Sequence, residues 1–352
     1  MQELKVSVII PVYNSGAFLK KCLDSVLAQS LRDMEIICIN DGSSDNSLEI
    51  LKQYASADQR IVIIDQSNQG QAIARNSGIA IAKGHYIGFV DSDDWIAENM
   101  FEELYKVAVS GNTDICFCEF LLCPSESSTP SQPEWCKIPF NKHFDGKTFN
   151  WLEVNDSIFT INTGPFNKIY SREFIQKNNI IFAENCHFED VLFVYNSAFY
   201  ASKINYVRSP LYFYRNDRAS SVSSDKGIKQ FDIFTVLELL RSKLLHMNYF
   251  SQISEQFDAF CFSKMMFHLS EVNTYHKKDF IEQIKIEYEK LNQREKKNVK
   301  RNVLLLKILL LFGYNTYKAF NATIFLSYKV LNPIIDLKKL VHEKLSTFKT
   351  EK

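Results

Sequence analysis

Three carboxylates fall within four residues in the segment Asp91-Ser92-Asp93-Asp94, directly after an apolar run at residues 86–90. Like charges at this spacing repel one another unless a positive group compensates them. A hard divalent cation with oxygen ligands, Mg2+ or Mn2+, is the usual compensator. Mg2+ of this kind is typically held by one or two carboxylates together with the phosphates of a substrate. The segment therefore predicts a metal and phosphate site, and the alternative is an Asp-rich turn that caps the next helix.

Polar residues also follow two other apolar runs of the N-terminal half. Asp41 is placed to accept a hydrogen bond from a base or a ribose, and Gly42 after it allows a close backbone approach. Asp45 or Asn46 can cap the next helix. Arg75 is predicted in the first turns of a helix, where it either steadies the acidic turn or contacts a nucleotide. Both interpretations of Arg75 stay open from the sequence.

The hydrophobic pattern of residues 5–118 predicts the elements that position these side chains. Strand patterns occupy Val6–Ile10, Glu35–Asn40, Ile61–Asp65, Tyr86–Val90 and Thr113–Cys118. Helix patterns occupy Gly16–Gln29, Asn46–Ala55, Gln71–Ala82 and Asn99–Ser110. Strands separated by helices in this way indicate βαβ units and a mostly parallel sheet, with ligands bound at the carboxyl ends of the strands. The expected fold class is α/β, a Rossmann-like sheet flanked by helices.

The remaining chain divides into three stretches. Residues 124–139 are rich in Pro and Ser, and their length predicts a loop over the site or an ordered insertion rather than a domain linker. Mixed α/β character resumes at about residue 149 and continues to 215. From residue 229 the pattern is helical, with apolar residues on one face.

Composition and charge exclude several function classes. Lys+Arg 41 balances Asp+Glu 41, so no global field indicates a nucleic-acid partner. Only Gly16 stands where a dinucleotide-binding unit would place Gly-x-Gly-x-x-Gly, which disfavours a nicotinamide or flavin enzyme.

Cys22 and Cys38 are predicted as small core residues. The N-terminus lacks the basic start and long apolar run of a secretory signal, which predicts a cytoplasmic protein.

A basic stretch at residues 294–301 directly precedes the apolar run 303–312, and a second apolar run covers 322–331. Neither run reaches the roughly 20 residues that span a bilayer. A basic flank beside apolar helices predicts peripheral docking on an anionic membrane, here the cytoplasmic face of the inner membrane. The alternative is a helix pair packed on the domain or on another copy of the chain, in a homodimer.

Taken together and in order, the motifs resemble the family 2 glycosyltransferases of GT-A fold, especially bacterial enzymes of capsule, exopolysaccharide and lipopolysaccharide assembly. The resemblance covers residues 5 to about 222. Its motifs are Val8-Ile9-Ile10-Pro11-Val12-Tyr13-Asn14, Asn40-Asp41-Gly42-Ser43-Ser44-Asp45, Ala74-Arg75-Asn76-Ser77-Gly78, Asp91-Ser92-Asp93-Asp94, Asn167-Lys168-Ile169-Tyr170, Phe188-Glu189-Asp190-Val191-Leu192-Phe193 and Tyr212-Phe213-Tyr214-Arg215. The implied organisation is a glycosyltransferase domain at 1–222, with a nucleotide-sugar half at about 1–118 and an acceptor half at about 119–222, followed by a helical region at 223–352.

The family implies inverting transfer of a sugar from a nucleotide sugar, usually a UDP-sugar, to a glycan or lipid-linked oligosaccharide acceptor. By position, the resemblance assigns the nucleotide-sugar contacts to Pro11, Tyr13, Asn14, Asp41, Arg75, Asp91 and Ser92. Asp93, with Asp91, would bind Mg2+ or Mn2+ bridging the diphosphate. Two other classes stay open: a nucleotidyltransferase-like enzyme, and a non-catalytic member that binds a glycan.

The resemblance implies that Asp190 is the catalytic base. Inversion by single displacement needs a base within hydrogen-bond reach of the acceptor hydroxyl, while a metal and donors neutralise the leaving diphosphate. The adjacent carboxylates Glu189 and Asp190 can shift each other's pKa, and only one is expected to face the acceptor. The alternative is a capping pair at a helix start. His187 is interpreted as a surface residue, a metal ligand or a group that orients the base.

Two positions depart from the family's usual pattern. Asn40 stands where an Asp is common, which keeps the hydrogen-bond acceptor and removes a charge. Phe166 replaces an aromatic residue that is often Trp, and a role in stacking on the acceptor stays open for it.

Overall fold

The computed structural model describes residues 4–124, 129–216, 226–247 and 250–294. The chain forms two compact units, residues 1–287 and 288–352. The described part of the second unit is the end of one helix, and all the other described elements belong to the first unit. The C-terminal apolar runs at 303–312 and 322–331 lie outside the described residues.

Four parallel strands form the N-terminal half of one eight-stranded sheet, whose order is β3-β2-β1-β4-β7-β6-β8-β5. They are β1 (Val6–Val12), β2 (Met34–Asp41), β3 (Ile61–Gln66) and β4 (Tyr86–Phe89). The helices between them are α1 (Gly16–Leu27), α2 (Ser47–Ala57) and α3 (Gln71–Ile81). Each predicted strand and helix of this half is confirmed to within two residues.

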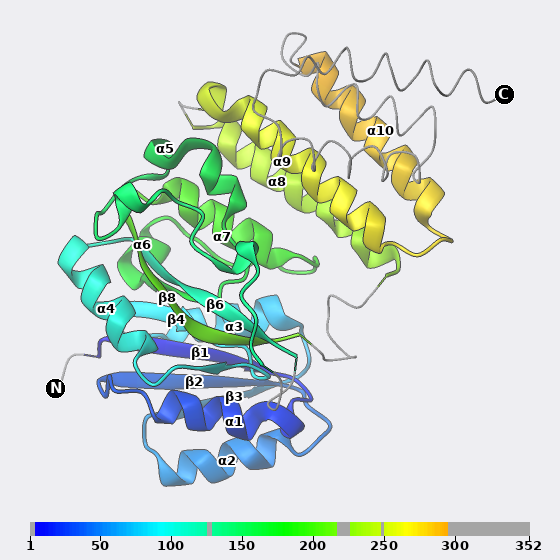
Figure 1. Cartoon of the computed structure of the whole chain (residues 1–352). Helices are drawn as coiled ribbons and strands as arrows, with labels where there is room; N and C mark the ends of the chain where they lie inside the picture. The colour runs from blue at the N-terminus through cyan, green and yellow to red at the C-terminus, as the bar shows by residue number, and fades with distance from the viewer. Residues whose placement is uncertain (1–3, 125–128, 217–225, 248–249, 295–352) are drawn as a thin grey trace. The chain divides into compact units, whose positions relative to one another are not determined.

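Helices cover both faces of this half of the sheet (Figure 1): α1 and α2 lie on one face and α3 on the other. β1 and β2 are buried along their whole lengths, which explains their continuous apolar runs. Gly78 of α3 has no room for a side chain, because a Cβ there would lie 2.6 Å from Cγ2 of Ile9. This glycine therefore sets how closely α3 approaches the sheet. Cys22 and Cys38 are fully buried, as predicted for core residues.

The second half of the sheet mixes strand directions, which the repeating pattern did not predict. β7 (Lys168–Ser171) lies antiparallel between β4 and β6 (Ile115–Cys123). β8 (Ile204–Arg215) runs parallel to β6, and the short β5 (Trp95–Ile96) pairs antiparallel with β8. The predicted strand at 113–118 is the first part of β6, which continues to Cys123 after a register shift beside Glu119. Four of the seven pairings are parallel, so the sheet is mostly parallel as expected.

Seven further helices are described. They are α4 (Met100–Gly111), α5 (Trp151–Val154), α6 (Arg172–Lys177), α7 (Glu189–Tyr200), α8 (Asp232–Leu245), α9 (Phe250–Glu271) and α10 (Lys277–Arg294). Short 3-10 segments are η1 (Glu134–Cys136), η2 (Lys142–Phe144), η3 (Asn155–Thr160) and η5 (Ile228–Phe231). α7 packs on α8, and α9 packs on α8 and η3. No described helix is both long and apolar enough to cross a membrane.

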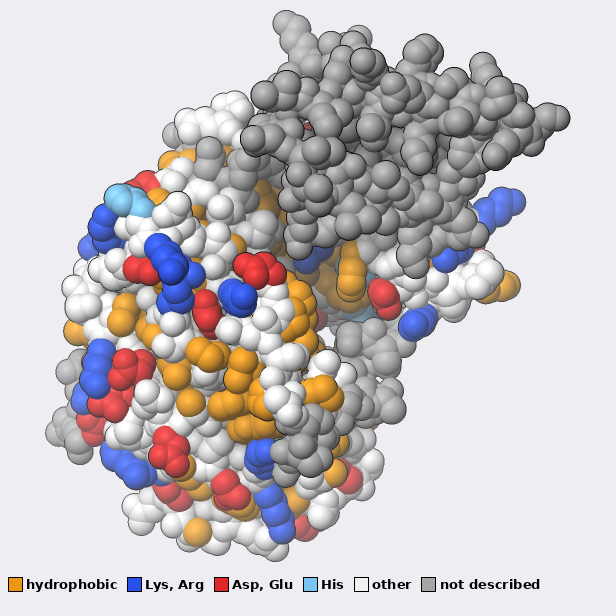
Figure 2. All heavy atoms as spheres, in the orientation of Figure 1, with side chains coloured by type: hydrophobic (Ala, Val, Ile, Leu, Met, Phe, Trp, Pro, Cys, Tyr) orange, Lys and Arg blue, Asp and Glu red, His pale blue; other side chains and the backbone are white. Residues whose placement is uncertain are grey.

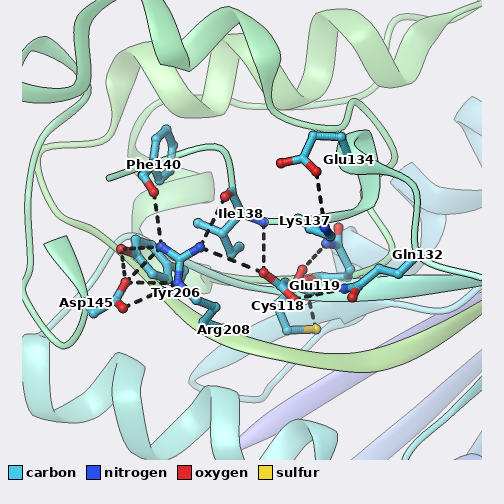
Figure 3. Close-up of polar contacts among 11 residues, drawn as sticks. Cys118, Glu119, Gln132, Glu134, Lys137, Ile138, Phe140, Asp145, Tyr206 and Arg208 are labelled. Atoms are coloured by element: carbon cyan, nitrogen blue, oxygen red, sulfur yellow. Dashed lines mark hydrogen bonds and ion pairs between the residues drawn. The ribbon is translucent and has the colours of Figure 1, made fainter. Parts of the chain in front are cut away.

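The described part of the Pro/Ser-rich stretch is an ordered insertion, one of the two predicted alternatives. Its anchor is the buried Glu119 of β6, which accepts hydrogen bonds from the Ile138 amide (3.1 Å) and the Gln132 side chain (2.9 Å), as Figure 3 shows. Arg208 of β8 donates to Asp145 (2.8 Å) and to the Phe140 carbonyl (3.1 Å). These bonds hold residues 132–145 against the β6–β8 pair.

The described part of the face in Figure 2 has no dominant charge. On the face in Figure 2, acidic and basic side chains are interspersed over the described part, and apolar side chains gather in one patch in its lower half. This distribution agrees with the balanced formal charge of the sequence.

Candidate functional site

The acidic turn, residues 91–94, lies at the carboxyl end of β4. Its carboxylates have different partners in the structure. Asp91 Oδ1 accepts a hydrogen bond from Arg75 Nη2 at 2.9 Å. Asp94 is buried, and its two oxygens accept from the Tyr212 hydroxyl (2.6 Å) and the Arg215 amide (2.7 Å). The Asp93 carbonyl accepts from Arg215 Nε at 3.0 Å. A cluster that looks uniform in the sequence therefore contains side chains with different environments.

Asp94 joins the acidic turn to β8. Its burial, followed by the nearby charges of Asp93 and Asp91, raises its pKa well above the usual value. The hydrogen bonds from Tyr212 and Arg215 oppose that shift. The Tyr212 hydroxyl also accepts from the Asp91 amide at 3.2 Å. One tyrosine thus fixes both ends of the turn to β8, and Asp94 has a structural role that the sequence did not distinguish.

Arg75 of α3 is the shared counterion of the site. It is 3% exposed, and its Nη1 donates to Glu189 Oε1 of α7 at 3.0 Å while Nη2 binds Asp91. The structure therefore has the first of the two predicted roles, in which Arg75 steadies the acidic turn. A direct contact of Arg75 with a nucleotide stays a prediction.

Asp190 lies in the first turn of α7, beside Glu189. Among the described residues, no side chain forms an ion pair with its carboxylate. Burial, followed by the charge of Glu189, raises the pKa of Asp190 to about 6, while Arg75 and Lys264 lower it. Because Glu189 is paired with Arg75, Asp190 is the carboxylate of this pair that stays available to accept a proton.

The other predicted contacts gather at the carboxyl ends of β1 and β2. Asp41 is buried and accepts hydrogen bonds from the amides of Gln69 (2.9 Å) and Gly70 (2.8 Å). In this structure it holds the loop before α3, and its contact with a base or ribose stays a prediction. Pro11 is buried within β1, and Tyr13 is 49% exposed beyond it.

Short polar bonds connect this second group with the acidic turn. Asn14 accepts from the Ser44 amide at 2.8 Å, which ties the ends of β1 and β2 together. The Ser15 and Ser92 hydroxyls lie 2.7 Å apart, so the chain after β1 contacts the acidic turn directly. Asn46 is the N-cap residue of α2, and the carboxylate of Asp45 just before it accepts from the Ser47 amide at 3.0 Å. The site residues predicted in four separate motifs thus belong to one connected region.

The donor chemistry of the acidic turn suits a cation shared with a substrate. Asp91 uses Oδ1 for Arg75, which leaves Oδ2 for a second interaction. Asp93, partly exposed beside it, is the second carboxylate. One or two carboxylates plus substrate phosphates are the usual ligand set of Mg2+ in such sites. Among the described residues, no three His, Cys, Asp or Glu side chains are grouped closely enough to hold a metal by themselves.

The structure shows the surroundings of two aromatic residues, Phe166 and His187, whose roles stayed open. Phe166 is buried and stacks on Tyr212 (centroids 4.5 Å apart), so its ring packs in the core. A role of Phe166 in stacking on the acceptor stays a prediction. His187 Nδ1 lies 3.0 Å from Asp232 Oδ2 at the start of α8. His187 thus ties the segment before α7 to the helical region.

Two lysines near Asp190 were not predicted to belong to the site. Lys168 is buried, and its Nζ donates to the Gly164 carbonyl (2.6 Å) and to Asn167 Oδ1 (2.7 Å). Burial lowers the pKa of Lys168 to about 7, and Asp190 opposes that shift. Lys264 of α9 also influences Asp190. Lys168 stood in a motif that could have marked it, whereas nothing local in the sequence marks Lys264.

Comparisons with known proteins show that the chain is similar to glycosyltransferases. The model of glycosyl transferase family 2 matches residues 7–173. The glycosyltransferase GlyG of Streptococcus pneumoniae is 31% identical over 232 residues, which cover 64% of this chain and 75% of GlyG. The uncharacterized glycosyltransferase YibD of Escherichia coli is 35% identical over 213 residues, covering 60% of this chain and 61% of YibD. The matched region spans 61 to 64% of the length of YibD and of two further curated relatives.

The fold is also similar to a solved structure. The crystal structure of S. aureus TarS 1-349 in complex with UDP superposes with a TM-score of 0.62 at 20% identity, covering 79% of this chain and 78% of that one. TarS 1-349 was also solved in complex with UDP-GlcNAc. At this level of identity the likeness establishes the fold.

We expect Tyr212→Phe to lower the free energy of unfolding by about 1–3 kcal/mol, because the buried Asp94 carboxylate and the Asp91 amide each lose a partner. Urea unfolding of the full chain measures the change. Tyr170→Phe is the matched control, since Tyr170 is equally buried and its hydroxyl has no partner among the described side chains and backbone. Equal losses in the two variants would contradict the role of Tyr212.

Proposed function

Because the chain belongs to glycosyl transferase family 2, we propose that it is an inverting glycosyltransferase that moves a sugar from a UDP-sugar to a hydroxyl of a growing glycan. One observation carries the proposal: Arg75 neutralises Asp91 and Glu189, while Asp190 beside them stays free of an ion pair among the described residues. A single available carboxylate, next to a phosphate and metal site, is what a one-step displacement requires.

In this mechanism Asp190 accepts the proton of the acceptor hydroxyl. Its raised pKa of about 6 makes it a stronger base than an ordinary Asp and leaves it mostly ionised at neutral pH. The ion pair between Arg75 and Glu189 fixes the first turn of α7, and so orients the Asp190 side chain next to it. Glu189 is in this view a positioning residue, and Asp190 is the catalytic residue.

Asp93 and Asp91 would hold Mg2+ or Mn2+ on the other side of the reacting centre. The bound cation would supply charge neutralisation for the departing diphosphate, so no acid is needed there. Arg75 limits the repulsion that Asp91 would otherwise add near the phosphates. Tyr13, Asn14, Asp41 and Ser92 complete the proposed nucleotide-sugar side. The UDP and UDP-GlcNAc complexes of TarS support a uridine nucleotide as the donor.

We also propose that the acceptor is lipid-linked and that the helical region at 223–352 brings the catalytic domain at 1–222 to an anionic membrane surface. The proposal rests on the basic and apolar pattern of residues 294–331.

Co-sedimentation with anionic vesicles tests this contact by comparing the full chain with a chain ending at residue 293. The full chain is expected to sediment with the vesicles and the shortened chain to stay in the supernatant. Equal sedimentation would contradict the membrane role and favour packing of this segment on a second copy, which a measurement of mass in solution would show.

The main competing function is nucleotidyl transfer on a similar α/β sheet, which would also use an acidic turn with a metal. Nucleotidyl transfer would give Asp190 no clear role. The products separate the two reactions, because glycosyl transfer releases UDP and nucleotidyl transfer releases pyrophosphate. A non-catalytic glycan-binding member would release neither.

Asp190→Asn is expected to lower the rate of transfer or of slow UDP-sugar hydrolysis by about 10²–10⁴-fold, with donor binding unchanged, because the variant keeps the shape and loses the base. Asp93→Ala should instead lose Mn2+-dependent donor binding. UDP release and donor affinity are measured over a panel of UDP-sugars. Glu173→Gln, a first-turn carboxylate on α6, is the control. An active Asp190→Asn variant would exclude Asp190 as the base.

The pH profile provides a separate test. Since the base must be ionised, kcat/KM should rise with pH through about 6, the raised pKa of Asp190. The charged neighbours are Glu189, which raises this pKa, and Arg75 and Lys264, which lower it. Lys168 also lies near and carries its own pKa of about 7. Glu189→Gln should move the rising limb to lower pH, and a move to higher pH would contradict the assignment.

A further inference from the structure

The turn before Asp190, residues 187–189, contacts two helices that follow β8 in the chain. The amide and the Nδ1 of His187 lie 2.9 Å and 3.0 Å from Oδ2 of Asp232, at the start of α8. The ring of Phe188 packs on the ring of His268 of α9, with centroids 4.3 Å apart. Two successive residues of the turn are thus held by the helical region.

The backbone of Phe188 explains why its ring needs a partner. Phe188 has φ of 64° and ψ of 29°, a left-handed conformation that is rare for a bulky residue and persists where surrounding contacts hold it. The two other left-handed residues of the segment before α7, Asn179 and Asn185, are of a type that tolerates this conformation. Phe188 is the N-cap residue of α7, and its carbonyl accepts from the Val191 amide at 3.1 Å. Its conformation therefore sets how the first turn of α7, with Asp190, begins.

His268 is itself fixed in place beside this ring. It is 4% exposed, and its Nδ1 lies 2.6 Å from Oε1 of Gln230, a buried residue of η5. Burial, followed by the charge of Lys264, lowers the pKa of His268 to about 3, so the ring is neutral at neutral pH. In a neutral imidazole one nitrogen donates, and here Nδ1 faces an acceptor. The hydrogen bond to Gln230 thus fixes the orientation of the ring that packs on Phe188.

We propose that His268 is a positioning residue for Asp190: its ring keeps Phe188 in the left-handed conformation, and this conformation places the base at the acceptor hydroxyl. The inference rests on the proposed function, in which Asp190 is the base. A base must lie within hydrogen-bond reach of the proton it removes, so a change of direction at the start of α7 moves it out of reach. Arg75 holds the next residue, Glu189, and α9 supplies the second support.

Two substitutions in the full chain separate the ring of His268 from its hydrogen bond. His268→Phe keeps the ring and loses the donor, whereas His268→Asn keeps a donor near the place of Nδ1 and loses most of the ring. We expect His268→Asn to lower the kcat of UDP-sugar hydrolysis by about 10- to 100-fold with the KM of the donor unchanged, the loss typical of a misplaced catalytic group. His268→Phe should keep most of the wild-type kcat. A wild-type kcat in His268→Asn would overturn the proposal.

Phe257→Leu is the matched control, because Phe257 is another buried ring of α9. The ring contacts described for it lie outside the turn, with Phe159, Phe250 and Phe260. This variant should lower the free energy of unfolding, measured with urea, and keep the wild-type kcat. An equal loss of kcat in Phe257→Leu and His268→Asn would mean that general loosening of α9 explains the effect, and would overturn the proposal.

A double variant tests whether the two rings act through each other. Phe188→Leu removes the other partner of the contact, so it should lower kcat alone, and the double variant with His268→Asn should lose no more than the larger single loss. Losses that multiply would show two independent effects and would overturn the proposal.

Hydrogen exchange of the Val191 amide tests the support of the turn without turnover. This amide bonds the Phe188 carbonyl, so it should exchange faster in His268→Asn than in the wild type. Unchanged exchange would overturn this inference and leave the proposed function intact. An active Asp190→Asn variant would instead overturn the proposed function, and with it the role of His268 in positioning the base.

Discussion

The ion pairs of Arg75 are the interaction on which the site depends. One guanidinium from α3 binds Asp91 after β4 and Glu189 at the start of α7, two carboxylates almost a hundred residues apart in the sequence. Removing one partner of a buried pair leaves an uncompensated charge, which typically costs about 3–5 kcal/mol. The parallel half of the sheet and α7 are therefore held together by a contact that also sets the charge of the site.

This distribution of partners underlies the proposal that Asp190 is the catalytic base. Asp94 accepts hydrogen bonds from Tyr212 and the Arg215 amide, and Glu189 and Asp91 both pair with Arg75. Asp190 remains as a carboxylate with a raised pKa and no ion pair within the described residues.

Most of the N-terminal fold could be predicted because its signals are local. The alternation of apolar strands and amphipathic helices predicts β1 to β4 and α1 to α3, because each pattern lies within about a dozen residues. The antiparallel β7, inserted between β4 and β6, could not be predicted in this way. Its pairing depends on which strand edges the other strands leave free, and a four-residue strand carries no signal for that choice.

The sequence by itself determined the residue types of the site: the acidic turn, Arg75, and the Glu189-Asp190 pair, each marked by its place after a strand or at a helix start. Only the tertiary structure decided how they are used. It buried Phe166 in the core, bound Asp94 to Tyr212, and paired Arg75 with Asp91 of the acidic turn. It also placed Lys264 of α9 where its charge lowers the pKa of Asp190. Partners of a charge are set by distances in space, which segments far apart in the chain acquire only when they pack.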